Sequence, residues 1–337
     1  MPPDRPLEPS NRMRYLKASS TTFDYISQPA ANSPPPMRSG LILVLLLAAV
    51  PARHAAAQDP DPVDVLIVTA HPDDEAMFAA TVYAITHHLG GHVDLALVTD
   101  GSGGFSYAGL AEPLYGLDLD NEAVARHHLP AIRKQELMAG GRIIGLRNYF
   151  FLDQLDHAFT TNVDTVLQHV WDVDFVRERL VTLLQRYPYD YVLVHLPIDE
   201  GFHGHHKAAT ILALEAVQTF PPAQRPVVLG GLVGSSEDAG AMEMAYEGLP
   251  GYPITAVDPA TPVAVFDRRG PLSEDGRLDY RIIVNWLIAE HKSQGTMQLF
   301  MMRPEADLER FWFFALNDPA RRVEVERLFE RLADARP

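Results

Sequence analysis

Three side chains that bind metals or move protons stand close together at residues 71–75, which read His-Pro-Asp-Asp-Glu. An apolar, β-branched run at residues 63–70 precedes them and predicts a buried strand, and the pattern of residues 76–88 predicts a helix. In an open α/β sheet, ligands bind outside the carboxyl ends of the strands. The imidazole and the two aspartates therefore indicate a metal site or an acid–base site.

A second cluster of histidines lies at residues 195–206, between a predicted buried strand and a predicted helix. Its members are His195, His203, His205 and His206. Asp100 likewise follows a predicted strand, at residues 92–98. Because the carboxyl ends of parallel strands meet at one edge of a sheet, these side chains and those of residues 71–75 can converge there.

The combination of residue types suits metal-assisted hydrolysis. Catalytic zinc takes three protein ligands and leaves a position for water. His71 and Asp74 stand three residues apart at a helix start, so both can aim at one point, and one imidazole from residues 203–206 completes the set. Water on such a metal ionises near neutral pH. Because Asp73 is not one of the three ligands, it would be free to act as general base on that water. A second imidazole would stabilise the oxyanion or protonate the leaving amine.

These residues resemble the LmbE-like, or PIG-L, family of N-acetylglucosamine deacetylases. The resemblance covers roughly residues 63–220 and is most specific at residues 71–75. Weaker matches lie at residues 98–101, at Arg133 and Glu136, at Phe151-Leu152 followed by Asp156, and at residues 203–206. The resemblance implies a hydrolase that removes the N-acetyl group from an N-acetylglucosamine-type amino sugar or glycoconjugate. An amidase of sugar-amide conjugates and a non-catalytic metal- or carbohydrate-binding protein are the alternatives.

The resemblance also implies a role for individual residues. One zinc ion per chain would be held by His71, Asp74 and His206, with Asp73 as general base and His203 as catalytic histidine. A set of two histidines and one aspartate also accepts other divalent metals.

The family's late motif is usually His-Pro-Asp-His, and this chain has His205 where the family has aspartate. The change either alters the proton affinity of His203 or allows His205 to take over the role of His203 or His206.

Other side chains have two readings each. Arg133 and Asp100 are substrate-binding candidates, but Arg133 could instead pair with Glu136, and Asp100 could cap its own loop. A structural role at a helix end is favoured over catalysis for His291, and the aromatic residues 311–314 are predicted to pack in the core.

Composition narrows the classes of protein further. The chain has 337 residues, a formal charge of -16 and no cysteine. The negative charge argues against nonspecific binding to nucleic acid or to an anionic membrane surface. Without cysteine, any metal must be held by His, Asp, Glu or water. Composition does not indicate a substrate; the family resemblance implies a small amino sugar or glycoconjugate, and the sequence leaves the oligomeric state open.

The N-terminal residues predict export. Met37-Arg38, the apolar run 41–50 and the small residues 55–57 follow the three-part order of a secretory signal peptide. The run is too short for a membrane-spanning helix, so we expect cleavage near Ala57 and no membrane span in the mature chain. Residues 1–36 are predicted to be disordered, and we expect them to be a misassigned extension before the true start at Met37.

Strands and helices are predicted to alternate along residues 63–220, which favours a mostly parallel, Rossmann-like sheet with helices on both faces. Residues 58–337 are read as one domain, in which residues 221–337 shape the substrate groove. Further strands are predicted at 148–152, 190–196, 227–233 and 263–266, and further helices at 131–144, 172–187, 207–220, 278–294, 304–316 and 321–333.

Overall fold

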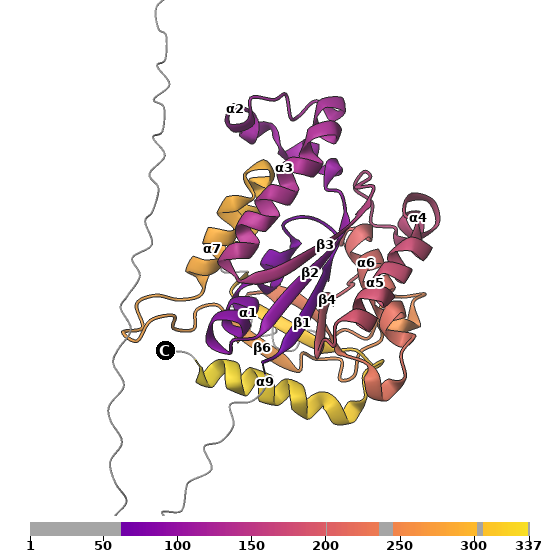
Figure 1. Ribbon diagram of the computed structural model, residues 1–337, viewed down its shortest axis with the longest axis vertical. Helices are drawn as coiled ribbons and strands as arrows, with labels where there is room; N and C mark the ends of the chain where they lie inside the picture. The colour runs from indigo at the N-terminus through magenta and orange to yellow at the C-terminus, as the bar shows by residue number, and fades with distance from the viewer. Residues whose placement is uncertain (1–61, 200, 236–244, 302–305, 336–337) are drawn as a thin grey trace, which may run out of the picture. The chain divides into compact units, whose positions relative to one another are not determined.

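The computed structural model of the protein describes residues 62–199, 201–235, 245–301 and 306–335 (Figure 1). The predicted extension 1–36 and signal peptide 37–57 lie outside these residues. Within the described part of the chain, none of the helices combines the length and the apolar character that crossing a bilayer requires.

A seven-stranded sheet forms the centre of the fold, in the order β3-β2-β1-β4-β5-β7-β6. The strands are β1 Asp64–Thr69, β2 His92–Thr99, β3 Leu146–Gln154, β4 Tyr191–His195, β5 Val227–Gly234, β6 Ala264–Asp267 and β7 Leu308–Phe313. The first five in this order pair in parallel, whereas β7 runs antiparallel to both β5 and β6. The predicted mostly parallel α/β sheet is thus confirmed.

Helices cover both faces of this sheet. They are α1 Ala79–Tyr83, α2 Glu112–Tyr115, α3 Glu122–Ile143, α4 Val163–Thr165, α5 Val173–Arg186, α6 Gly204–Gln218, α7 Arg281–Glu290, α8 Thr296–Met301 and α9 Arg322–Asp334. A 3-10 turn, Asp74–Phe78, leads into α1, and a π-helical turn, Ala84–His88, follows it. Figure 1 shows α1, α3 and α7 on one side of the sheet and α4, α5 and α6 on the other.

A hydrophobic core lies on each face of the sheet, because the pleat of the strands sends side chains to both faces. Successive side chains of a strand point to opposite faces of the sheet. In β1, Val65 and Ile67 pack into the core that contains residues of α1, α7 and α9, while Leu66 and Val68 pack into the core that contains residues of α5 and α6. All four are buried, which is why the strand reads as a continuous apolar run.

The strand order places a switch in chain direction between β1 and β4. From β1 the chain moves outward to β2 and β3, and from β4 it moves the other way to β5. β1 and β4 pair directly, with Val65 opposite Tyr191 and Val68 opposite Val194. The loops that leave their carboxyl ends therefore diverge at neighbouring points, which is where doubly wound sheets bind ligands.

Two of the predicted elements were wrong. The predicted helix 304–316 is instead strand β7, whose six residues are all buried between β5 and β6. The charged Glu309 and Arg310 stand side by side among the apolar residues of this run, so its sequence lacks the alternation that predicts a strand. Helix α3 begins at Glu122, well before the predicted start at 131, because Asn121 caps the backbone amides of Ala123 and Val124.

A buried ion pair ties β7 to the helical segment after residues 71–75. The Glu309 carboxylate accepts hydrogen bonds from the Ala80 and Thr81 amides at 2.9 Å each and from Arg268 Nε at 2.9 Å. Arg268 also donates from Nη2 to the carbonyl of Ala76 at 2.7 Å. Since both charged side chains are buried, each depends on the other for its neutralisation.

Replacing one member of this pair should be far more costly than replacing a surface pair. We expect Glu309→Gln to lower the free energy of unfolding by about 3–5 kcal/mol, because it leaves the Arg268 charge buried without a partner. Glu324→Gln, which removes the carboxylate of the half-exposed pair Arg321–Glu324, should lower it by less than about 1 kcal/mol. Urea denaturation measures both, and equal losses would contradict the assignment.

Candidate active site

The turn after β1 is folded by its own carboxylates. Asp74 Oδ2 accepts hydrogen bonds from the amides of Ala70 at 3.0 Å and His71 at 2.7 Å. Glu75 Oε2 accepts one from the Asp73 amide at 3.0 Å. The backbone of Asp73 has φ 126°, a conformation that residues other than glycine rarely adopt. Such strain persists only where the surroundings enforce it, and it concentrates at functional sites.

The structure brings together the three residues predicted as metal ligands. His71 Nδ1 lies 3.1 Å from His206 Nε2 and 3.6 Å from Asp74 Oδ2, and His206 Nε2 lies 3.1 Å from Asp74 Oδ1. Zinc–ligand bonds of about 2.0–2.2 Å in a tetrahedral site place the ligand atoms about 3.3–3.6 Å apart. The donor types and their separations therefore fit a metal ion at this position.

Of the second cluster, His205 and His206 lie in the first turn of helix α6 and His203 immediately precedes it. Contacts from two other segments hold this turn in place. The Gly204 amide donates to the carbonyl of Thr160, and a Cβ at position 204 would lie only 2.9 Å from the carbonyl oxygen of Asn162. The buried ammonium of Lys207 donates to Thr161 O at 3.1 Å and to Asp199 O at 2.8 Å. The sequence gives no sign that Lys207 anchors this turn, because only the fold shows that its side chain points inward.

The role of the unusual His205 becomes visible at the start of α6. His203 caps the helix, and its Nδ1 accepts a hydrogen bond from the backbone amide of His205 at 3.2 Å. The two rings stack with their centres 4.3 Å apart. The His205 side chain therefore packs on His203 instead of accepting its proton, as a carboxylate at that position could do.

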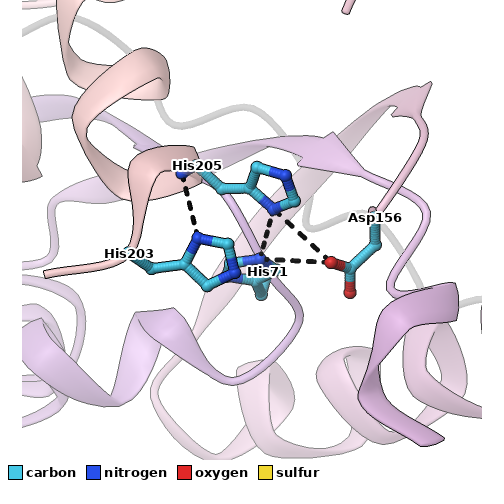
Figure 2. Close-up of side chains that lie close together, drawn as sticks. All are labelled: His71, Asp156, His203 and His205. Atoms are coloured by element: carbon cyan, nitrogen blue, oxygen red, sulfur yellow. Dashed lines mark hydrogen bonds and ion pairs between the residues drawn. The ribbon is translucent and has the colours of Figure 1, made fainter. Parts of the chain in front are cut away.

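Asp156 completes a second group of donors, shown in Figure 2. Its Oδ1 lies 3.5 Å from His71 Nε2 and 3.4 Å from His205 Nδ1, and the two ring nitrogens are 3.0 Å apart. The sequence offered only a weak motif match for Asp156, so its position at the centre of the site was missed. His195 is a further buried neighbour, with Nδ1 3.9 Å from Asp74 Oδ2.

Burial and charge set the pKa values of the acidic residues and of His71. Burial raises the pKa of Asp73 to about 6, against the opposing charge of Arg133. Burial acts in the same direction on Asp74, but the nearby His206 and His195 outweigh it and hold its pKa well below the usual range. For His71, burial lowers the pKa, but Asp156 and Asp74 together raise it to about 10.

Three other histidines of the site, His203, His205 and His195, are neutral at neutral pH. Burial, followed by the charge of His71, lowers the pKa of His203 to about 2. Burial also lowers the pKa of His205 to about 4 and that of His195 to about 3. Because Nδ1 of His203 accepts a hydrogen bond from the His205 amide, the neutral ring carries its hydrogen on Nε2.

Arg133 does not pair with Glu136. Its Nη1 donates to Gly101 O at 2.9 Å, and its Nη2 donates to Pro72 O at 2.7 Å and to Asp73 Oδ2 at 3.3 Å. The side chain is buried, so its positive charge holds the carboxylates and loops of the site in place. Glu136 instead accepts hydrogen bonds from the backbone and side chain of Ser293.

Asp100 organises the loop between β2 and α3. Its Oδ1 accepts hydrogen bonds from the amides of Ser102 at 2.9 Å and Asp156 at 3.1 Å. This is the loop-capping arrangement that the sequence left as one of two readings. It also fixes the backbone that carries Asp156.

His291, in the C-terminal part of the chain, stabilises the turn 71–75 through Glu75. It follows α7, and its Nε2 lies 2.5 Å from Glu75 Oε1 in a pair with no exposed surface. Burial lowers the pKa of His291, but the charge and hydrogen bond of Glu75 outweigh it, and the pKa is raised. The other oxygen of Glu75 holds the amide of Asp73, so His291 stabilises the strained turn through Glu75.

A protein-family model matches the segment of the chain that carries most of these residues. The model of the PIG-L family, described as GlcNAc-PI de-N-acetylase, matches residues 66–217. This segment of the chain belongs to the PIG-L family. The PIG-L segment contains the turn 71–75, Arg133, Asp156 and the histidines at the start of α6.

Individual relatives are distant. A probable N-acetyl-alpha-D-glucosaminyl L-malate deacetylase 2 from Bacillus cereus is 27% identical over 175 residues, which are 52% of this chain and 70% of that protein. An N,N'-diacetylchitobiose deacetylase from Pyrococcus horikoshii is 17% identical, with 77% of this chain and 87% of that chain covered and a TM-score of 0.43. A deacetylase of the A40926 pseudoaglycone is 18% identical, with 77% and 99% covered and a TM-score of 0.44.

A 4-carboxy-2-hydroxymuconate hydratase from Pseudomonas putida is 17% identical, with 74% of this chain and 95% of that chain covered and a TM-score of 0.42. At TM-scores below 0.5, these structural likenesses support no conclusion about this chain.

The Glu75–His291 pair predicts a pH-dependent contribution to stability. The folded-state pKa of His291 is above its unfolded value, so its contribution is complete below about pH 6.5 and is lost as pH rises through the raised pKa. We expect His291→Asn to lower the free energy of unfolding by about 3–5 kcal/mol at pH 6 and by less at higher pH. Urea denaturation at several pH values, with the exposed His127→Asn as control, measures this. A deficit independent of pH would refute it.

Proposed function

We propose that this chain is a zinc-dependent deacetylase that removes the N-acetyl group from an N-acetylglucosamine-type amino sugar or glycoconjugate. The observation that supports it most is the approach of His71, Asp74 and His206 within a PIG-L segment, with Asp73 beside them. The family name and the Bacillus cereus relative point to the same class of reaction.

His71, Asp74 and His206 would hold the zinc ion. Their spacing matches a tetrahedral site, and the low pKa of Asp74 keeps its carboxylate ionised and able to bind a cation. A bound zinc ion would supply a Lewis acid that acidifies water and polarises the amide carbonyl.

Asp73 is the proposed general base. It is adjacent to the three donors but is not among them, and it lies against Arg133. Its pKa of about 6 suits a group that must take up a proton near neutral pH and release it again. Asp73 would take a proton from the attacking water and pass it to the leaving amine.

His203 would act as a hydrogen-bond donor to the oxyanion. Because the His205 amide occupies its Nδ1, the neutral ring can donate from Nε2. Of the two roles that the sequence leaves open for a second imidazole, this hydrogen bond favours stabilising the oxyanion over protonating the leaving amine. A neutral donor stabilises a developing negative charge without having to give up a proton.

Arg133 and Asp100 remain proposed substrate-binding residues. In the described structure their polar atoms bind the site's own backbone and carboxylates. Any contact with a sugar would be made from these positions at the edge of the site.

Two substitutions separate metal binding from proton transfer. Asp73→Asn should retain stoichiometric zinc after dialysis but reduce acetate release from acetylated amino sugars by about 10²–10⁴-fold, because the base is lost. His206→Ala should lose both the tightly bound zinc and the activity. Metal analysis by mass spectrometry and an acetate assay measure the two effects. Normal deacetylation by Asp73→Asn would eliminate it as the base, and retained tight zinc in His206→Ala would eliminate that ligand. Release of larger acyl groups, but not acetate, would favour the sugar-amide amidase.

We also propose that the protein is exported to the periplasm or outside the cell. The proposal rests on the sequence of residues 37–57 alone, with Met37 as the true start. The mature protein recovered from its native cells should begin at Gln58 or a close neighbour, as N-terminal sequencing would show. A chain that begins near Met1 and stays in the cytoplasm would rule export out.

A further inference from the structure

The donors in Figure 2 form a group separate from the proposed zinc ligands, although the two groups share one ring. His71 directs Nδ1 toward Asp74 and His206, and its opposite nitrogen, Nε2, toward His205 and Asp156. His203 belongs to the second group as well. A carboxylate beside a metal-bound histidine is a common orienting contact, but that role requires Asp156 alone. It does not account for two additional imidazoles.

The separations in this second group are those of a coordination site. The three contacts among His71 Nε2, His205 Nδ1 and Asp156 Oδ1 measure 3.0, 3.5 and 3.4 Å. The edges of a tetrahedral zinc site are about 3.3–3.6 Å long. His203 adds a fourth donor within 4.8 Å of the others. All except His203 are buried, so the donors are held in place by packing.

The chemistry of the donors also suits a borderline-soft divalent ion. Three imidazoles and one carboxylate are typical zinc ligands. Asp156 is the one carboxylate of the group, and its Oδ1 faces both His71 and His205.

We propose that the cluster His71, Asp156, His203 and His205 is a second binding site for a divalent metal ion such as Zn²⁺. The site depends on His205, the residue that stands where the PIG-L pattern has aspartate. It would fill after the site of His71, Asp74 and His206, and would bind its ion more weakly. The second dication is repelled by the first across the His71 ring and by Arg133, which lies 3.4 Å from Asp156.

Occupation of the second site would inhibit the enzyme. A metal ion there would engage His203, which the proposed function assigns to the oxyanion. It would also share His71 with the first ion: the ring would release its remaining N–H proton to solvent and bridge the two ions as an imidazolate. This consequence rests on the proposed function, whereas binding of the second ion does not. Excess zinc would then act as a regulator or inhibitor of the same chain that requires zinc.

Metal titration tests the second site without reference to activity. After removal of bound metal with a chelator, calorimetric titration of the full chain with Zn²⁺ should show two ions per chain, the second at least about tenfold weaker than the first. His205→Asn should bind one ion with the tight affinity unchanged. His157→Asn, which changes a histidine next to Asp156 whose ring hydrogen-bonds to the carbonyl of Ala158, should bind two. Saturation of the wild type at one ion, or two ions in His205→Asn, would overturn the proposal.

A second variant and an activity assay make the result independent of one substitution. If circular dichroism shows that His205→Asn is unfolded, Asp156→Asn should lose the weaker ion instead, and its retention would equally overturn the site. Acetate release by the wild type should fall as Zn²⁺ exceeds one equivalent, and this fall should be absent in His205→Asn. Two bound ions without acetate release under any condition would refute the proposed function but leave the second site standing.

Discussion

The direct pairing of β1 with β4 is the constraint on which the rest of the site depends. These strands are separated by more than a hundred residues, yet they run side by side and in parallel, so their carboxyl ends open at neighbouring points. The turn 71–75 leaves one strand and the residues before α6 leave the other. From these two strands the chain proceeds in opposite directions along the sheet, which is the arrangement at which doubly wound sheets bind ligands. Both histidine clusters and their carboxylates consequently face one another.

Charge pairing then holds this edge of the sheet in one conformation. Each carboxylate of the turn accepts from backbone or basic groups: Asp74 from the amides of the turn, Glu75 from the Asp73 amide with His291 behind it, and Asp73 from Arg133. After the turn, Glu309 accepts a hydrogen bond from the Ala80 amide at the start of α1 and is itself paired with Arg268. These groups are buried, so each would be costly alone and is stable only as part of the set. The strained backbone of Asp73 is the visible result of that mutual restraint.

His205 shows how one substitution redistributes the chemistry of such a set. An aspartate at this position could hold the proton of the adjacent His203. The histidine instead stacks on His203, directs a nitrogen toward His71 and Asp156, and leaves His203 with only a backbone amide on Nδ1. The catalytic candidate becomes a neutral donor, and an additional imidazole enters a space already lined by metal-binding atoms. The same change thus underlies both the proposed role of His203 and the proposed second metal site.

Local pattern was sufficient for the sheet class and most strands, because buried strands and the turns after them leave short-range traces in sequence. His71, Asp74 and His206, which the pattern and the family resemblance together single out, lie close to one another in the structure. Local pattern could not determine β7, because Glu309 and Arg310 interrupt the alternation of a strand and only pairing with β5 and β6 places them in the interior. Nor could it place Asp156, Lys207 or the partners of Arg133, since these depend on contacts between segments remote in the chain. The sequence by itself therefore determined which chemical groups the edge of the sheet carries. Only the tertiary structure decided which of them share a proton or could share a metal ion, because those interactions act over about 3 Å and follow from packing.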